Sequence, residues 1–160
     1  MTTSPSTTEP KDNREVVRRL YEECINLGKM ELLPELVSDD FVADGQVGVS
    51  GFANNVAGLR TGFPDIHFTL EDMIAAGDRV VVRWKWRGTH AGPFRGLPAS
   101  HKPITNTGIV IYQVRDGRVV RAWLETDRLG ALQQMGAVPA FGPPPAKPAP
   151  REKAAGAPGS

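Results

Sequence analysis

The sequence predicts an α+β domain in which helices precede an antiparallel sheet and cover one of its faces. In the first part of the chain, apolar residues recur three and four positions apart, the period of an amphipathic helix. After Pro64 they recur at every second position, the period of a half-buried strand. Helices followed by a run of strands indicate a curved antiparallel sheet packed against three N-terminal helices.

Three helices are expected before Pro64. The first is capped by Asp12 or Asn13 and ends at Gly28. The second spans residues 31–37, and the third runs from about residue 50 to the residue before Pro64, where helical geometry is disfavoured. A short helix of residues 129–135 follows the strands. The apolar positions that define these helices are Val16, Val17, Leu20, Tyr21, Cys24 and Leu27; Leu32, Leu33, Leu36 and Val37; Phe52, Val56, Leu59 and Phe63; and Leu129, Leu132 and Met135.

Four strands are expected after Pro64. Residues 66–71 and 80–87 alternate between apolar and polar side chains, and a turn at 76–78 joins them. A loop rich in Gly and Pro, residues 88–103, leads to a hairpin that runs from Thr105 to Asp127. Its two strands flank Asp116-Gly117, a strong signal for a two-residue hairpin turn.

A regular hairpin around this turn predicts which side chains share a face. Arg115 would pair with Arg118. Counting back pairs Tyr112 with Arg121, Val110 with Trp123 and Asn106 with Asp127. The opposite face would be smoothly apolar. Its members would be Thr107, Ile109, Ile111, Gln113, Val120, Ala122, Leu124 and Thr126. The face that mixes aromatic and ionisable groups is therefore the expected wall of a small-molecule site.

Length and composition limit the possible functions. A chain of 160 residues is expected to form one domain, residues 13–138, between disordered segments 1–12 and 139–160. The net charge of +1 and the pI near 7.9 argue against nucleic-acid or membrane partners. Cys24 is the single cysteine, so no disulfide can form within the chain. The three histidines have no metal-ligand spacing, so we expect no metal, although carboxylates with one histidine stay open. The N-terminus has no apolar leader, and a cytoplasmic protein is expected.

The predicted sheet has apolar residues on both faces, and one set of helices can cover only one of them. The other face would expose a large apolar patch in a monomer. We therefore expect a homodimer that forms through the face carrying Ile109, Ile111 and Leu124.

Several short motifs follow one another in a characteristic order. They are residues 63–65 (FPD), 84–90 (WKWRGTH), 92–98 (GPFRGLP), 116–119 (DGRV), and Trp123 with Asp127 followed by 132–136 (LQQMG). Together they resemble the SnoaL-like polyketide cyclases of the nuclear transport factor 2-like, ketosteroid isomerase-like superfamily. The resemblance covers residues 14–137. It implies a cone-shaped fold with a pocket between sheet and helices, and a cofactor-free intramolecular aldol reaction on a polyketide-like or polycyclic carbonyl compound.

The proton-transfer residue expected from this resemblance is Asp127, because its carboxylate would lie against Trp123 at the inner wall of the pocket. The alternative is that Asp127 caps the helix beginning at Arg128. Asn106 would orient the carboxylate. His90 either faces the pocket as a proton shuttle or donor, or fixes the following loop by bonding its backbone.

Further candidates come from the helices and from the aromatic residues. Tyr21 and one asparagine of the pair Asn54 and Asn55 would orient a substrate oxygen, while Trp84 and Trp86 would form part of the pocket wall. Glu125 and Asp44 are candidates for a second ionisable group. Asp44 lies in a stretch, residues 44–49, where family members commonly have a histidine. A water-activating hydrolase or dehydratase and a non-catalytic ligand-binding domain remain as alternative functions.

Overall fold

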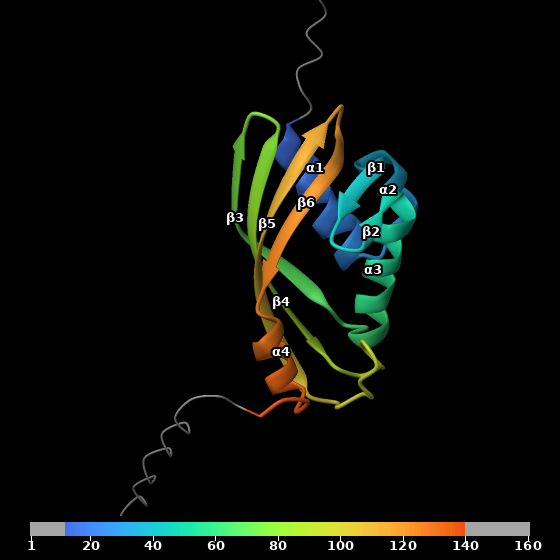
Figure 1. Cartoon of the computed structure of the whole chain (residues 1–160), viewed down its shortest axis with the longest axis vertical. Coiled ribbons are helices and arrows are strands. Elements are labelled where there is room, and N and C mark those ends of the chain that lie inside the picture. Colours follow the sequence, from blue (N-terminus) through green and yellow to red (C-terminus); the bar gives the residue numbers. More distant parts are fainter. Residues whose placement is uncertain (1–11, 140–160) are drawn as a thin grey trace, which may run out of the picture.

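A curved, open six-stranded sheet organises the chain, and the computed structural model describes residues 12–139 of it (Figure 1). The strand order is β2-β1-β6-β5-β4-β3. The α+β class and the expected sheet are confirmed. The expected disordered segments, 1–12 and 139–160, lie outside the described residues except for Asp12 and Pro139. The strands are β1 (Val37–Ala43), β2 (Gln46–Val47), β3 (His67–Ala76), β4 (Arg79–Thr89), β5 (Pro103–Arg115) and β6 (Arg118–Thr126).

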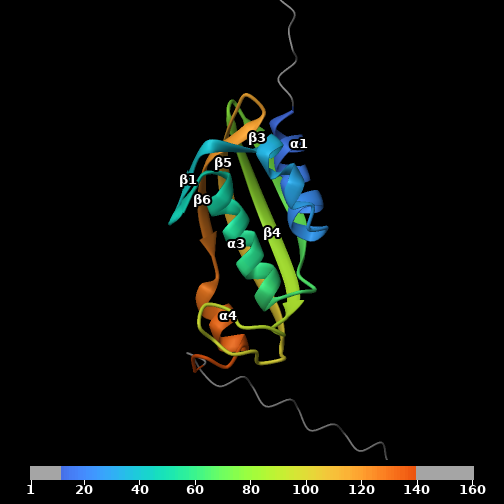
Figure 2. The same cartoon turned by 90° about the vertical axis from the view of Figure 1, so that its right-hand side faces the viewer.

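Helices cover one face of this sheet. The longest, α3 (Gly48–Gly62), lies lengthwise across that face in Figure 2. The others are α1 (Asn13–Arg19), η1 (Leu20–Asn26), η2 (Met30–Leu32), α2 (Leu33–Leu36) and α4 (Arg128–Gln134). Helix α4 follows β6 directly and lies at the opposite end of the molecule from the β5–β6 turn (Figure 1).

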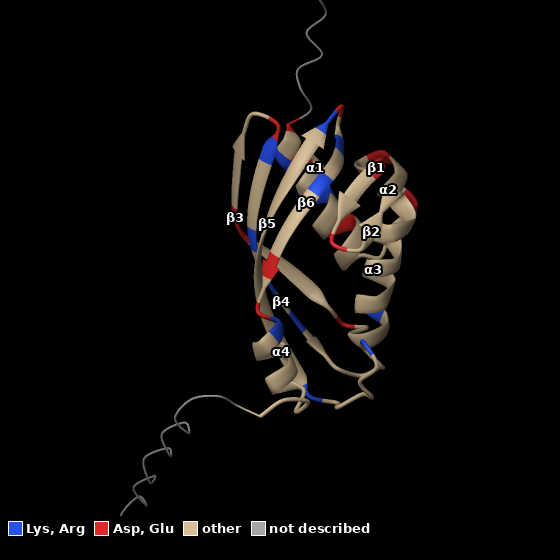
Figure 3. Ribbon diagram, viewed as in Figure 1, with Lys and Arg blue, Asp and Glu red and all other residues tan. Residues whose placement is uncertain are grey.

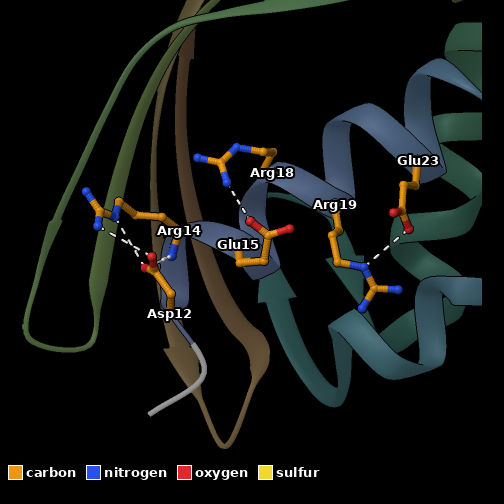
Figure 4. Close-up of polar contacts among 6 residues, drawn as sticks. All are labelled: Asp12, Arg14, Glu15, Arg18, Arg19 and Glu23. Atoms are coloured by element: carbon orange, nitrogen blue, oxygen red, sulfur yellow. Dashed lines mark hydrogen bonds and ion pairs between the residues drawn. The ribbon is translucent and has the colours of Figure 1, made fainter. Parts of the chain in front are cut away.

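The first helix begins as the sequence predicts. The Asp12 carboxylate accepts a hydrogen bond from the Arg14 backbone N–H at 3.1 Å, which satisfies one of the unpaired N–H groups of the first turn. Ion pairs continue along the helix surface (Figure 4). They join Arg14 to Asp12, Arg18 to Glu15 and Arg19 to Glu23. Such partly exposed pairs add little stability, so the buried face determines where this helix packs.

The helix does not continue as one α-helix to Gly28. Residues 20–26 form a π-helix, a rare conformation that is often found at functional sites. Its end is held by side chains from other elements. Asn26 exchanges two hydrogen bonds with the backbone of Phe68, at 2.8 and 2.9 Å, and Arg60 donates to the Ile25 carbonyl at 2.6 Å. These contacts take up backbone groups at the boundary of β3 and the helical layer.

The expected second helix is too long, and two strands were not expected at all. Its α-helical part ends at Leu36, because Val37 begins β1, which pairs parallel with β6. The sheet is therefore mixed. Residues 38–40 of β1 are polar and partly or fully exposed, so this strand has no clear apolar alternation. Its pairing with a strand some eighty residues further along the chain supplies the stability that the local pattern does not show.

The β5–β6 hairpin has the expected turn but a different register. Arg115 pairs with Arg118 around Asp116-Gly117, and both turn residues have positive φ angles. Val114 then pairs with Val119, but Gln113 pairs with Arg121, so Val120 has no partner opposite it. This extra residue is a β-bulge.

The bulge reverses the faces of all later residues of β6. Val110 pairs with Leu124 instead of Trp123, and Ile111 pairs with Trp123. The predicted pairs Val110–Trp123 and Asn106–Asp127 are therefore wrong. Ala122, Leu124 and Thr126 face the helices. Trp123 and Glu125 join the outer face of the sheet. Leu124 consequently cannot belong to the outer dimer face that the sequence predicts, and Trp123 takes its place.

Candidate functional site

Two adjoining cavities lie between the sheet and its helices. They measure about 80 and about 170 Å³ and share Asn55, Leu59, Phe68, Trp84 and Leu124. Larger hollows, of about 450, 420 and 320 Å³, exist elsewhere on the surface, but no aromatic residue among those described lines them. The aromatic cavities are the better ligand site, because small-molecule pockets are lined mainly by apolar and aromatic side chains.

The smaller, inner cavity contains a pair of tyrosine hydroxyl groups. Tyr21 comes from the π-helix and Tyr112 from β5, and their hydroxyl oxygens are 2.6 Å apart. Burial raises the pKa of Tyr21 well above its usual value, and the neighbouring Tyr112 raises it further. Burial also raises the pKa of Tyr112, against the opposing effect of its hydrogen bond with Tyr21. Both groups therefore stay protonated and neutral, and the pair has one O–H left to donate beyond the bond that joins the two hydroxyls.

Trp84 of β4 lines both cavities and presents a buried donor. Its indole Nε1 has no hydrogen-bond partner among the described residues. The indole N–H lowers the pKa of Tyr21 because it would stabilise the charged oxygen, but its geometry toward the Tyr21 hydroxyl does not make a hydrogen bond. A buried donor without a partner is costly, and a ligand oxygen in the cavity would remove that cost. Trp86, two residues further along β4, lines the larger cavity.

Asn106 lines the larger cavity and is 8% exposed. Its amide nitrogen donates to the Thr126 hydroxyl at 3.1 Å, and its carbonyl oxygen accepts the Thr107 N–H at 2.9 Å. The Thr126 hydroxyl donates in turn to the Thr107 carbonyl at 2.9 Å. These bonds hold Asn106 in the cavity wall, but the side chain on β6 to which it bonds is Thr126 and not Asp127.

The structure places Asp127 outside both cavities. Its Oδ1 atom accepts the Gly130 backbone N–H at 2.8 Å, so Asp127 is the N-cap of α4 and is exposed. This is the capping alternative, and the geometry expected of a catalytic Asp127 is absent. The bulge at Val120 is the physical reason, because it shifts the register of the end of β6 by one residue and so moves each side chain to the other face of the sheet. Trp123, 40% exposed, and Glu125, also exposed, leave the expected site for the same reason.

His90 fixes the loop of residues 90–102 in place. Its side chain is 1% exposed and its ring stacks on Phe63. Nδ1 accepts the Ser100 backbone N–H at 3.2 Å and lies 2.8 Å from the Ser100 hydroxyl. The His90 backbone also exchanges hydrogen bonds with His101 and Lys102. His90 lines neither cavity, so the geometry matches the loop-fixing alternative rather than that of a proton shuttle.

The remaining candidates divide between the cavity and the surface. Asn55 lines both cavities, whereas Asn54 is exposed on the other side of α3. Asp44 is exposed in the turn between β1 and β2. Sequence reasoning missed Tyr112 as a site residue. Tyr112 is two residues from Val110 in β5 and therefore shares its face, which was a signal for a position beneath the helices. The incorrect hairpin register placed the charged Arg121 opposite Tyr112 and obscured that signal.

Neither cavity is lined by an Asp, Glu or His side chain among the described residues. Within residues 12–139, no three His, Cys, Asp or Glu side chains gather as metal ligands would. No helix in that range has both the length and the apolar character needed to cross a bilayer. The polar groups that the cavities offer are hydroxyl, amide, indole and guanidinium groups, which suit a ligand with oxygen acceptors.

An open, curved sheet that holds an aromatic cavity beneath its helices defines the nuclear transport factor 2-like class. The chain belongs to the SnoaL-like polyketide cyclase family, whose model matches residues 15–135. No curated protein shows a significant match to it.

Three solved structures illustrate the similarity. IdmH from Streptomyces antibioticus, provisionally described as a polyketide cyclase, is 29% identical; the match covers 78% of this chain and 99% of IdmH with a TM-score of 0.67. A provisionally described SnoaL-like polyketide cyclase from Jannaschia sp. CCS1 is 25% identical, with coverages of 85% and 99% and a TM-score of 0.74. TsrD from Streptomyces laurentii is 25% identical, with coverages of 78% and 95% and a TM-score of 0.72.

Proposed function

We propose that the chain is a cofactor-independent cyclase that closes a ring in a polyketide-like carbonyl compound bound in the two adjoining cavities. The observation that carries the proposal is the meeting of three buried polar groups at one place. They are the hydroxyls of Tyr21 and Tyr112, which bond to each other and leave one O–H free to donate, and the indole N–H of Trp84, which has no hydrogen-bond partner among the described residues. Such donors suit the oxygen atoms of a carbonyl compound, and the surrounding aromatic rings suit its carbon skeleton. Family membership supports an enzymatic role for this site.

The tyrosine pair suggests how an aldol closure would proceed without a carboxylate base. A methylene group between two carbonyls enolises readily, so the substrate can enter the reaction as its enol. The enol carbon attacks a second carbonyl and forms the new C–C bond. As it does so, the enol O–H proton passes to one tyrosine oxygen, that hydroxyl passes its proton to the other, and the second protonates the new alkoxide. The tyrosines end in their initial protonation state, and no net charge is created in the apolar cavity, where charge is costly.

A non-catalytic ligand-binding role is the second candidate, and one observation favours it. No carboxylate or imidazole lines either cavity among the described residues, so the usual general bases are missing there. The same observation gives no support to a hydrolase that activates water. The binding role and the cyclase role predict the same occupant but differ in whether the tyrosine hydroxyls affect a rate.

The test uses an aromatic 1,3-diketone that carries a second carbonyl within reach of ring closure, and follows the cyclised product by chromatography. Tyr112→Phe keeps the ring and removes one hydroxyl of the relay. We expect it to lower the rate by about 100-fold to 10,000-fold, the usual range for acid–base catalysis. Trp123→Phe, on the outer face, is the matched aromatic control and should leave the rate unchanged. A Tyr112→Phe protein that retains the full rate contradicts the relay. If no acceleration occurs but the diketone binds, the ligand-binding role is favoured.

A further inference from the structure

Two arginine side chains line the larger cavity at the end of the molecule where α4 lies. Arg95 belongs to the loop of residues 90–102 and Arg128 is the first residue of α4. Figure 3 shows basic positions, coloured blue on the ribbon, at this end of the molecule. Both arginines are exposed. Neither makes an ion pair or a side-chain hydrogen bond with another residue in the range 12–139, so both guanidinium groups are free to meet a ligand. The mouth of the cavity therefore presents two guanidinium groups and no described carboxylate.

The backbone at Arg95 has a conformation that is unusual for arginine. Arg95 has a φ angle of +46°, in the left-handed region that favours Gly, Asn and Asp. An arginine there stores conformational strain, and residues held in such conformations cluster at functional sites. The following Gly96, with φ of +79°, completes a tight turn that is closed by the hydrogen bonds between Phe94 and Leu97.

The turn also holds the Arg95 side chain on a rigid support. The Arg95 guanidinium carbon lies 5.4 Å from the centre of the Phe94 ring, within range of a cation–π contact. Phe94 itself packs edge-on against the buried Phe63 and lines the cavity. Arg128 is positioned from the other side by the capped start of α4. Two independent elements thus place a cation at one cavity mouth.

We propose that Arg95 and Arg128 form an anion subsite, and that the natural ligand is a polycyclic or aromatic compound with a carboxylate at the end that lies in the mouth. A guanidinium offers two parallel donors that match the two oxygens of a carboxylate. The carbonyl end of the same ligand then reaches inward toward the tyrosine pair. This inference rests on the proposed function only in requiring that the cavity binds a ligand, and it does not depend on catalysis.

The test compares 2-naphthoic acid with 2-naphthamide, its neutral counterpart of the same shape, by NMR titration of the full chain. The indole N–H signals of Trp84 and Trp86 report cavity occupancy, and that of Trp123, on the outer face, is an internal control. We expect the acid to bind about 2-fold to 30-fold more tightly than the amide, because the two ion pairs are exposed to solvent and each contributes only modestly. Arg95→Gln and Arg128→Gln should each reduce that preference, and the double variant should abolish it.

Controls separate the subsite from a general effect of charge. Arg118→Gln removes one exposed arginine outside both cavities and should preserve the preference for the acid. Affinity for the amide should change by less than about threefold in every variant, because only the charged contact is removed. Equal binding of acid and amide by the unaltered chain would overturn the anion subsite while leaving a ligand-binding cavity. A shift of only the Trp123 signal, or no binding of either compound, would overturn both the subsite and the cavity proposal.

Discussion

Replacement of Asp127 distinguishes a helix cap from a catalytic carboxylate. The structure makes it the N-cap of α4, with Oδ1 2.8 Å from the Gly130 nitrogen. Asp127→Ala removes this bond and should lower the free energy of unfolding by about 1 kcal/mol, within the range of roughly 0.5–2 kcal/mol for lost caps. In a domain of this length that corresponds to a fall of about 3–5 °C in melting temperature. Asp127→Asn keeps a good capping group and should leave the melting temperature unchanged.

Gly130 provides an independent check of the same geometry. A Cβ atom added at Gly130 would lie 2.2 Å from Oδ2 of Asp127, so Gly130→Ala must displace the cap. It should therefore destabilise the unaltered chain, although alanine is normally the better helix former by about 1 kcal/mol. In the Asp127→Ala background the clash is gone, and Gly130→Ala should become neutral or stabilising. Thermal unfolding of the four proteins measures this coupling between the two positions.

The catalytic reading of Asp127 makes the opposite prediction for activity. If Asp127 were the base, Asp127→Asn would lower the ring-closure rate about 100-fold to 10,000-fold without changing the melting temperature. The structure predicts that the rate per folded molecule stays within about threefold of the unaltered chain, since Asp127 lines neither cavity. A large loss of rate in a fully stable Asp127→Asn protein would refute the placement of this side chain and, with it, the bulged register.

Three further predictions concern other parts of the fold. Gly108→Ala should push the Trp84 indole aside, because the new Cβ would lie 2.5 Å from the ring. We expect chemical denaturation to show a free energy of unfolding lower by about 1–3 kcal/mol, and the naphthyl probes to bind more weakly. Unchanged values would contradict the packing of Trp84 against Gly108. Two hydrogen bonds from Thr89, led by its backbone N–H, hold the pKa of Asp65 below its usual value. The unaltered chain should therefore have a higher melting temperature than Asp65→Ala above about pH 4, and this difference should disappear as the pH falls through the lowered pKa. A difference in melting temperature that does not depend on pH would refute this. Trp123→Lys should shift a dimer toward monomer in analytical ultracentrifugation, since the exposed outer face is the predicted dimer surface; a monomeric unaltered chain at tens of micromolar would contradict the dimer itself.

Much of the fold was predictable because its signals are local. The capped start at Asp12, the helix across residues 48–62 and the turn at Asp116-Gly117 all follow from short-range spacing and backbone preferences. The aromatic residues of β4 were also predictable, since Trp84 and Trp86 keep regular alternation with exposed neighbours. Strand β1 was not, because the polar residues 38–40 interrupt any apolar pattern and its partner is distant in sequence.

The composition of the site depended on one residue. In a regular hairpin Arg121 would lie opposite Tyr112, on the face beneath the helices, and a buried arginine without a carboxylate partner is costly. The bulge at Val120 turns Arg121 outward, where its guanidinium lies 5.2 Å from the centre of the Trp123 ring. The energetic cost of burying Arg121 in a regular hairpin was therefore the signal in the sequence that could have predicted the bulge.

The sequence by itself determined the class of fold, the order of its elements and most of the aromatic residues that surround the cavity, because helix and strand periods are properties of neighbouring residues. Only the tertiary structure decided that Asp127 caps a helix, that Tyr112 meets Tyr21, and that two arginines share one cavity mouth. Side chains in a strand alternate between faces, so one unpaired residue, Val120, reverses every side chain that follows it in β6. Whether that residue is accommodated depends on what lies above and below the sheet, and those neighbours come from distant parts of the chain.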